Sequence, residues 1–305
     1  MAGKKKRRWL KVIGYPIFFL LILIPSLFNT FPFERVKGRV LREAEKRSGY
    51  RIEVALMEPS LLGGLDLTNV RLYEKARRGR AVEGKPKPTF AFEQVSIQLG
   101  LLALLAGDIT VSVSTDLFGG ELSGTYGEET GGTGIEVRWS DLDLKKAKAL
   151  EDYTGVEVGG IASGEAHVVL DKGRLSKANG ELSVRFEQAM ILGGKVRGFQ
   201  LPPIQIGDLD LSAKVDKGRV SLKKLEAESP DINAQVEGTL SLSDKIENSR
   251  LNLKTIFGFS DKFLEKNKAI KGGLSLIQRA KGKDGRYGYR LTGPIRRPTP
   301  RAWRR

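Results

Sequence analysis

The feature that most constrains the fold of this chain is an alternation of apolar and polar residues that recurs after Tyr50. In six separate runs, every second residue is apolar and the residues between them are polar or charged, with Val169 as the one exception; these runs are 109–114, 135–139, 166–170, 181–186, 209–215 and 231–237. A period of two is typical of strands that bury one face and expose the other. One-sided burial is common in antiparallel sheets. The sequence therefore predicts a mainly β fold made of antiparallel strands.

Short repeats indicate how the strands are connected. Asp171–Arg174 and Asp216–Arg219 both read Asp-Lys-Gly-Arg, and each stands between two alternating runs, which predicts a tight hairpin at each place. The pattern Gly-x-Leu-Ser recurs at 120–123, 180–183 and 238–241, about 60 residues apart. This spacing favours repeated meander units over one closed architecture.

A few segments interrupt the strand pattern. We expect short helices over Leu142–Asp152 and over 261–269, the second with Ser260 as its N-cap. The apolar run 99–106 is too short to span a membrane. It predicts a buried turn or helix between strands, and the alternative is an element that dips into a membrane or binds a partner. The stretch 75–88 is expected to be a solvated basic loop.

The chain begins with a basic cluster and a long apolar segment. The cluster comprises Lys4, Lys5, Lys6, Arg7, Arg8 and Lys11, and no residue from 12 to 33 is charged. At about 1.5 Å per residue this segment is roughly 33 Å long, close to the ~30 Å hydrocarbon thickness of a bilayer. Its apolar core includes Val12, Ile13, Phe18, Phe19, Leu20, Leu21, Ile22, Leu23, Ile24, Leu27 and Phe28. Because basic flanks stay in the cytoplasm, we expect 1–11 to be cytoplasmic, 12–33 to be a transmembrane anchor, and the remainder to lie across the membrane.

A cleaved signal peptide is the alternative interpretation of this start. The apolar run exceeds the roughly 7–15 residues of a signal-peptide core, and no small-x-small cleavage site follows it, so an uncleaved anchor is favoured. After the anchor, apolar residues recur every four positions at Val36, Val40 and Ala44, which predicts a helix over 34–49. This helix is either a juxtamembrane stalk or a cap on the first strand.

Composition narrows the functional classes. About 270 residues follow the anchor, enough for one large domain or two moderate ones. The chain has no cysteine, which excludes disulfides and thiolate sites and fits an exported domain in a bacterial periplasm. The net charge is +16, but the first eleven residues supply six positive charges and the last ten supply five, which leaves +5 for the rest. We therefore expect no nucleic-acid partner.

The sequence shows little that indicates catalysis. It contains no P-loop, no dinucleotide-binding fingerprint, no nucleophile elbow and no cluster with metal-ligand spacing. The single histidine, His167, falls on the polar side of its strand and is expected to be structural or exposed. Asp-Leu-Asp-Leu at 141–144 and 208–211 offers carboxylates, but calcium takes about six to eight oxygens, so we expect solvent-facing aspartates. We predict no enzyme activity, no cofactor and no metal; a hydrolase would need a convergent acid pair in a deep cleft.

Several segments resemble known envelope proteins. Arg47–Ile52 and then Leu61–Leu72, after an anchor and a short helix, are similar to the start of AsmA-like envelope proteins. Leu201–Leu209 and the ending Tyr287–Pro294 with Pro298 resemble type II secretion system protein N of the short δ-proteobacterial type. The resemblance implies an elongated, curved β-meander over 50–293. The prolines at 294, 298 and 300 separately predict a flexible basic tail over 294–305. It also implies a non-enzymatic, inner-membrane-anchored periplasmic subunit of the general secretion machinery, with other secretion subunits as partners.

The kinship with AsmA-like proteins implies an alternative role in lipid transport or outer-membrane assembly. In that role the apolar face of the sheet would be a trough for phospholipid. The two roles differ in one observable. A lipid carrier needs an apolar face that is continuous and uncovered, whereas a scaffold needs that face packed shut.

Overall fold

The computed structural model describes residues 38, 41–42, 45–46, 50–60, 64–74, 88–100, 103, 107–196 and 199–303. The predicted cytoplasmic segment 1–11 and the predicted anchor 12–33 lie outside these residues, as do most of the segments 75–88 and 99–106. Within the predicted helix 34–49, the five described positions are helical. Across the described part of the chain, no helix is both long and apolar enough to cross a membrane.

The chain forms two compact units, Met1–Leu105 and Ala106–Arg305. The first unit contains an antiparallel sheet of β1 (Tyr50–Ser60), β2 (Gly64–Glu74) and β3 (Phe90–Leu99). Its core gathers around Met57, Leu67 and Val70. Asn69 has a φ of +52°, and the core-facing positions of β2 change there from Leu65 and Leu67 to Val70 and Leu72. Asparagine tolerates this left-handed conformation better than most residues do.

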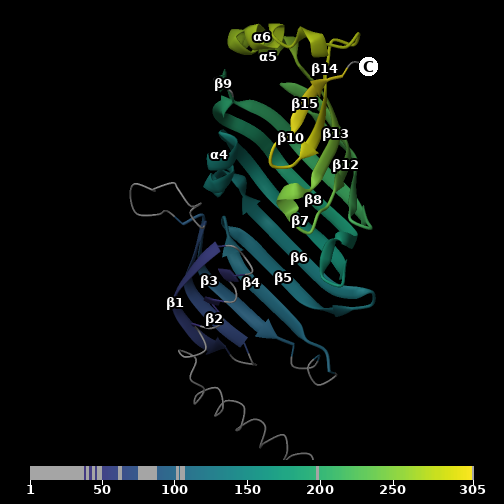
Figure 1. The fold of residues 1–305 in the computed structure, drawn as a ribbon. Coiled ribbons are helices and arrows are strands. Elements are labelled where there is room, and N and C mark those ends of the chain that lie inside the picture. Colours follow the sequence, from purple (N-terminus) through teal and green to yellow (C-terminus); the bar gives the residue numbers. More distant parts are fainter. Residues whose placement is uncertain are drawn as a thin grey trace, which may run out of the picture. The chain divides into compact units, whose positions relative to one another are not determined.

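The second unit is a long antiparallel meander (Figure 1). Its strands pair in chain order: β4 (Thr110–Leu117), β5 (Gly120–Glu129), β6 (Gly132–Asp143), β7 (Val156–Asp171), β8 (Arg174–Val196), β10 (Ile204–Asp216), β11 (Arg219–Glu228), β12 (Ile232–Ser241), β13 (Arg250–Phe259), β14 (Tyr287–Pro294) and β15 (Thr299–Ala302). The short β9 (Phe199–Leu201) pairs with β8. The prediction of a mainly β, antiparallel meander with few helices is confirmed.

The two predicted hairpins are also confirmed. They join β7 to β8 and β10 to β11, with Asp171 opposite Arg174 and Asp216 opposite Arg219. In each turn the central Lys-Gly pair has positive φ, +51° and +70° in the first and +45° and +74° in the second. Two left-handed residues make the type I′ turn that matches the twist of paired strands. These turns help fix which residues of neighbouring strands share a face.

The helix predicted over 142–152 begins later than expected. Strand β6 continues through Leu142 and Asp143, which pair with Ala162 and Ile161 of β7. Pairing with β7 therefore overrides the local helical tendency of these two residues. The carboxylate of Asp143 then accepts a hydrogen bond from the Lys145 N–H at 3.0 Å. The helical elements that follow are η1 (Leu144–Lys146) and α4 (Lys148–Thr154), and α4 ends at a left-handed glycine.

A helical cap, formed by the segment between β13 and β14, packs on one end of the second unit. Ser260 is the N-cap, as predicted, and its Oγ accepts a hydrogen bond from the Phe263 N–H at 3.2 Å. The predicted single helix is interrupted at Asn267, which gives α5 (Asp261–Lys266) and α6 (Lys268–Ser275), followed by η3 (Gln278–Ala280). Leu274 and Ala280 of this cap pack with Tyr287 of β14, against further apolar side chains that include Phe257.

The flexible tail predicted over 294–305 is paired over part of its length. Strand β15 runs antiparallel to β14, with Thr299 opposite Thr292 and Ala302 opposite Tyr289. The Trp303 N–H also donates to the Gly288 carbonyl at 2.9 Å. The proline content led to the wrong expectation, because an edge strand tolerates proline where a central strand does not.

The connection between β12 and β13, which includes η2 (Ile246–Asn248), is held to β8 by a carboxylate. Asp244 accepts a hydrogen bond from the Ser176 N–H at 3.0 Å, and this bond lowers the pKa of Asp244 below its usual 3.8.

A carboxylate whose pKa is lower in the folded state than in the unfolded state stabilises the folded protein at pH values above the unfolded-state pKa. This contribution is lost as the pH falls through the folded-state pKa. We therefore expect Asp244→Asn to lower Tm slightly at pH 6 and by less at pH 3, measured by thermal unfolding. A decrease of equal size at both pH values would contradict this.

Candidate functional site

One face of the sheet in the second unit is apolar across ten strands. Because the strands pair in register, apolar residues stand opposite one another in rows that run across the sheet. One row contains Val113, Gly124, Val137, Ala166, Leu182, Ala213, Leu222, Gly238, Leu253 and Leu291. The rows beside it contain Val111, Tyr126, Ile135, Val168, Gly180, Val215, Val220, Leu240 and Leu251, and Leu122, Trp139, Gly164, Val184 and Leu211. We call these three rows the apolar stripe.

The apolar stripe is long compared with a lipid chain. Strands lie about 4.8 Å apart, so nine steps from β4 to β14 span roughly 43 Å along the sheet. A bilayer has a hydrocarbon core about 30 Å thick, so the chains of one leaflet reach about 15 Å. The stripe is therefore longer than the depth of a membrane leaflet.

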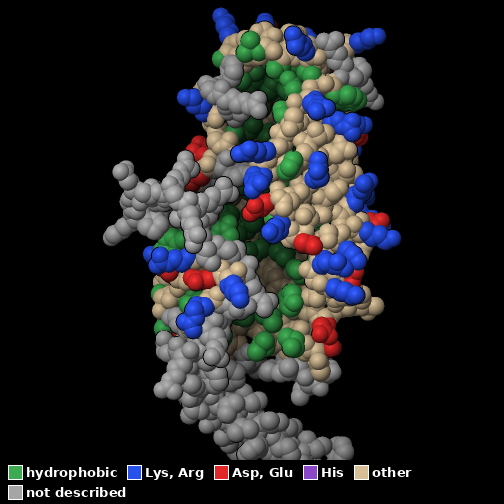
Figure 2. All heavy atoms as spheres, in the orientation of Figure 1, with side chains coloured by type: hydrophobic (Ala, Val, Ile, Leu, Met, Phe, Trp, Pro, Cys, Tyr) green, Lys and Arg blue, Asp and Glu red, His purple; other side chains and the backbone are tan. Residues whose placement is uncertain are grey.

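Only the margins of the stripe are packed into closed clusters. The β12–β13 connection supplies Leu242 to a cluster around Leu170, Ala178 and Val215, and Ile135, Val168 and Val220 from the same side row of the stripe also pack in this cluster. At the β14 end, α6 and η3 cover Tyr287. Elsewhere the larger side chains keep part of their surface exposed: Val113 is 37% exposed, Tyr126 is 53% exposed, and Val137, Val184 and Leu222 are half-buried. Figure 2 shows hydrophobic side chains gathered in a hollow that begins beneath α5 and α6. Within the described second unit, the stripe is continuous and not packed shut.

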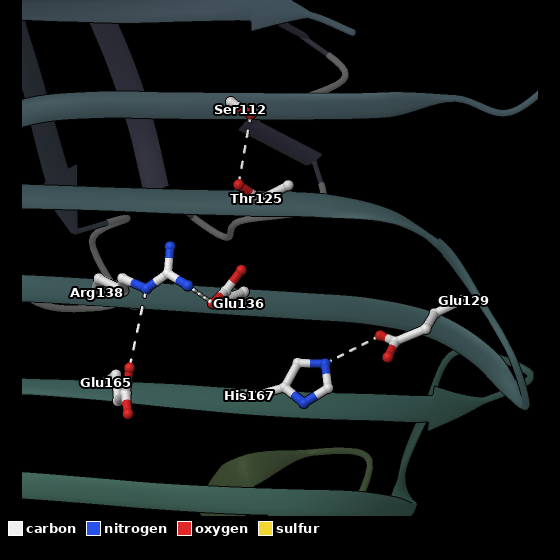
Figure 3. A network of polar contacts seen from close by, with 7 residues as sticks. All are labelled: Ser112, Thr125, Glu129, Glu136, Arg138, Glu165 and His167. Atoms are coloured by element: carbon white, nitrogen blue, oxygen red, sulfur yellow. Dashed lines mark hydrogen bonds and ion pairs between the residues drawn. The ribbon is translucent and has the colours of Figure 1, made fainter. Parts of the chain in front are cut away.

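The opposite face of the same strands is polar. Figure 3 shows its network on β4 to β7, where the Ser112 and Thr125 hydroxyls lie 3.4 Å apart and Arg138 forms ion pairs with Glu136 and Glu165. A hollow of about 570 Å³ is lined by polar side chains of this face, among them Ser123, Ser140, Ser163, Ser183, Ser212, Arg138 and Arg185, and is also bounded by Trp139, Gly164, Val184 and Leu211 from the third row of the stripe. Arg185 in turn lies 3.6 Å from the Asp210 carboxylate. Such exposed pairs contribute at most about 1 kcal/mol each, and they largely neutralise the charge of the hollow.

The histidine lies on this polar face, as predicted. Its Nε2 is 3.0 Å from the Glu129 Oε2, and both side chains are 42% exposed (Figure 3). The hydrogen-bonding partner of the His167 ring is therefore an acid at the rim of the sheet and not a nucleophilic hydroxyl.

The aspartates of the two Asp-Leu-Asp-Leu segments have structural partners. Asp143 caps η1, Asp208 accepts a hydrogen bond from the Gln188 N–H at 2.8 Å, and Asp210 faces Arg185. Asp141 has a φ of +57°, and its N–H donates to the Ser163 Oγ at 3.0 Å. Among the residues that the structure describes, no three His, Cys, Asp or Glu side chains are grouped as metal ligands.

Some of the site was not predicted from the sequence. The predicted topology residues (Lys4 to Lys11) and membrane-span residues (Val12 to Phe28) lie outside the described residues.

The sequence predicted the stripe as an apolar face of the sheet, but its extension along β8 beyond Phe186 was missed. Gln188 has a φ of +51° and the register shifts there, so that Ile191 pairs with Ile204 on the apolar side. Two consecutive polar residues, Glu187 and Gln188, were the only signal of this bulge.

Searches against protein-family models, curated proteins and solved structures found no match for this chain.

Proposed function

We propose that the second unit holds the acyl chains of phospholipid on its apolar stripe, as part of a membrane-anchored protein that moves lipid in the bacterial envelope. The single observation that carries this proposal is the continuity of the stripe together with its partial exposure. Of the two roles considered from the sequence, lipid transport requires an open apolar face and a structural scaffold requires a closed one. The open face therefore favours the lipid role.

The energetics of chain burial support the same choice. Each methylene group transferred from water to an apolar surface contributes about 0.8 kcal/mol, so a chain lying across several strands gains stabilisation without any specific polar contact. Monomeric soluble proteins rarely leave contiguous apolar patches of more than a few hundred Å² exposed unless the patch is functional. A stripe that crosses ten strands fits a ligand that is itself long and apolar.

The proposal extends to the location of the protein. If residues 12–33 anchor the chain in the inner membrane with the N-terminus in the cytoplasm, the stripe stands in the periplasm beside a source of phospholipid. Such a carrier needs no catalytic residue, cofactor or metal. Membership of the type II secretion system, with other secretion subunits as partners, stays a prediction from the sequence resemblance.

Site-specific photo-crosslinking of the full chain in its own membrane tests the proposal. p-Benzoylphenylalanine replaces Val137 or Val184, on the stripe, or Arg138 or Arg185, which are next in sequence and lie on the polar face. Because neighbouring residues of a strand point to opposite faces, lipid on the stripe reacts only with the first pair. We expect phospholipid adducts, detected by mass spectrometry, from positions 137 and 184 and background levels from 138 and 185.

The control positions make the outcome decisive. Equal adducts from both faces would reflect contact with bulk membrane and would contradict the proposal. Protein adducts from 137 and 184 without lipid would show that a partner covers the stripe. If those adducts contained secretion subunits, the scaffold role would replace the lipid role.

A further inference from the structure

The end of the second unit formed by the helical cap is strongly basic. Residues 260–286, which we call the basic tip, contain eight basic residues, Lys262, Lys266, Lys268, Lys271, Arg279, Lys281, Lys283 and Arg286. They contain three acidic residues, Asp261, Glu265 and Asp284. The tip therefore carries a net charge of +5 within 27 residues. Figure 2 shows Lys and Arg side chains projecting from this end, around α5 and α6.

The lysines of the basic tip have no ion-pair partner among the described residues. Arg286 pairs with Asp284 at 2.8 Å. By contrast, none of the six lysines of the tip forms an ion pair with a described residue, and all six are exposed. Uncompensated lysines on one end of a molecule create a positive potential that attracts an anionic surface.

A large apolar side chain protrudes among these lysines. Leu276, between α6 and η3, is 71% exposed, which is the highest value among the large hydrophobic residues that the structure describes. Its neighbours Leu274 and Ile277 face inward and belong to the cluster that holds the cap on β14. The tip therefore presents Leu276 to the outside from a backbone that is anchored on both sides.

We propose that the basic tip docks on an anionic lipid surface, with the lysines against the headgroups and Leu276 inserted at the boundary with the acyl chains. Lysines around an exposed apolar side chain are typical of proteins that bind at the membrane interface. Lysine offers a mobile point charge, which suits a fluid layer of headgroups, whereas a folded acidic protein is more often recognised by the rigid fork of arginine. In this proposal the membrane is contacted by seven residues of the tip, the six lysines and Leu276.

This inference does not rest on acyl-chain binding by the stripe. The stripe and the basic tip use different residues, and the two proposals are tested by different measurements. If both hold, the tip is a second membrane contact, separate from the predicted anchor.

The test uses the full chain, inserted through its apolar segment into nanodiscs of uncharged phosphatidylcholine. These nanodiscs are mixed with vesicles of phosphatidylcholine alone or of phosphatidylcholine with phosphatidylglycerol, and the vesicles are recovered by flotation. We expect recovery of the protein with the anionic vesicles only, and a decrease of that recovery as salt is raised, because salt screens exposed charges.

Variants identify the surface responsible. Each lysine near an anionic membrane contributes about 1 kcal/mol, so Lys268→Gln with Lys271→Gln should weaken vesicle binding about 25-fold. Leu276→Ser should weaken it roughly tenfold through lost apolar burial. The matched control is Lys214→Gln with Lys223→Gln, which removes the same charge from the polar face of β10 and β11. We expect the control to bind within about twofold of the original protein.

Three results would overturn the inference. The first is equal recovery with charged and uncharged vesicles, and the second is a loss of binding in the control as large as in the tip variant. The third is a preference for soluble polyglutamate over anionic vesicles, which would identify an acidic protein as the partner. Leu276 is exposed, so its serine variant decides the matter even if the double lysine variant fails to fold, as monitored by circular dichroism.

Discussion

Glutamate in place of Val184 is expected to reduce phospholipid adducts on the apolar stripe at least about tenfold, whereas glutamate in place of Ser183 leaves them unchanged. Val184 lies in a side row of the stripe, between Gly164 and Leu211 on the neighbouring strands. In the free protein a carboxylate there keeps contact with water, because the site is half-buried. An acyl chain would remove that water and leave the charge unpaired, which costs several kcal/mol.

The measurement uses p-benzoylphenylalanine at residue 222, in the same stripe but two strands away, so that the reporter does not touch the substituted position. Ser183 is the matched control, since it is next to Val184 in β8 and points to the polar face. Circular dichroism of both variants establishes that the sheet is intact. Unchanged adducts in the Val184→Glu protein would mean that lipid does not lie along the stripe.

The strands and hairpins were predictable because they depend on local patterns. Alternation fixes which residues of one strand share a face, and Asp-Lys-Gly-Arg is sufficient to specify a turn with two left-handed residues. The meander follows, since strands joined by short turns pair with their neighbours. By contrast, the end of β6 depends on pairing with Ala162 and Ile161, which lie some twenty residues away in the chain. The residues around Leu142 form no local pattern from which that pairing could be predicted.

The candidate site was likewise predictable where it depends on local sequence and unpredictable where it depends on distant contacts. Its apolar residues could be predicted from alternation, but their exposure could not, because exposure depends on what else in the molecule packs against them. The same limit applies to Leu276. Its sequence neighbours Leu274 and Ile277 are equally apolar, and only the packing of the helical cap shows which of the three points outward.

The register of the sheet also depends on particular glycines, and Gly164→Val is expected to lower the free energy of unfolding by about 3 kcal/mol. Gly164 stands opposite Trp139 of β6 and Val184 of β8. A Cβ atom at this position would come within 2.6 Å of the Trp139 Cζ2 and would also contact the Ser183 carbonyl oxygen. Either the indole ring or the β7–β8 pairing must then move, and overpacking of this kind is destabilising.

Gly124→Val is the matched control for this prediction. Gly124 lies on the same face, and a Cβ atom there would be 3.5 Å from the Glu136 carbonyl oxygen, an ordinary contact distance. Neither glycine has a positive φ, so the two substitutions differ in available space and not in backbone strain. Because valine favours strands more than glycine does, we expect Gly124→Val to change stability by less than about 1 kcal/mol, in either direction. Thermal unfolding of the full chain in detergent measures both variants, and equal losses of stability would show that Trp139 is not seated over Gly164.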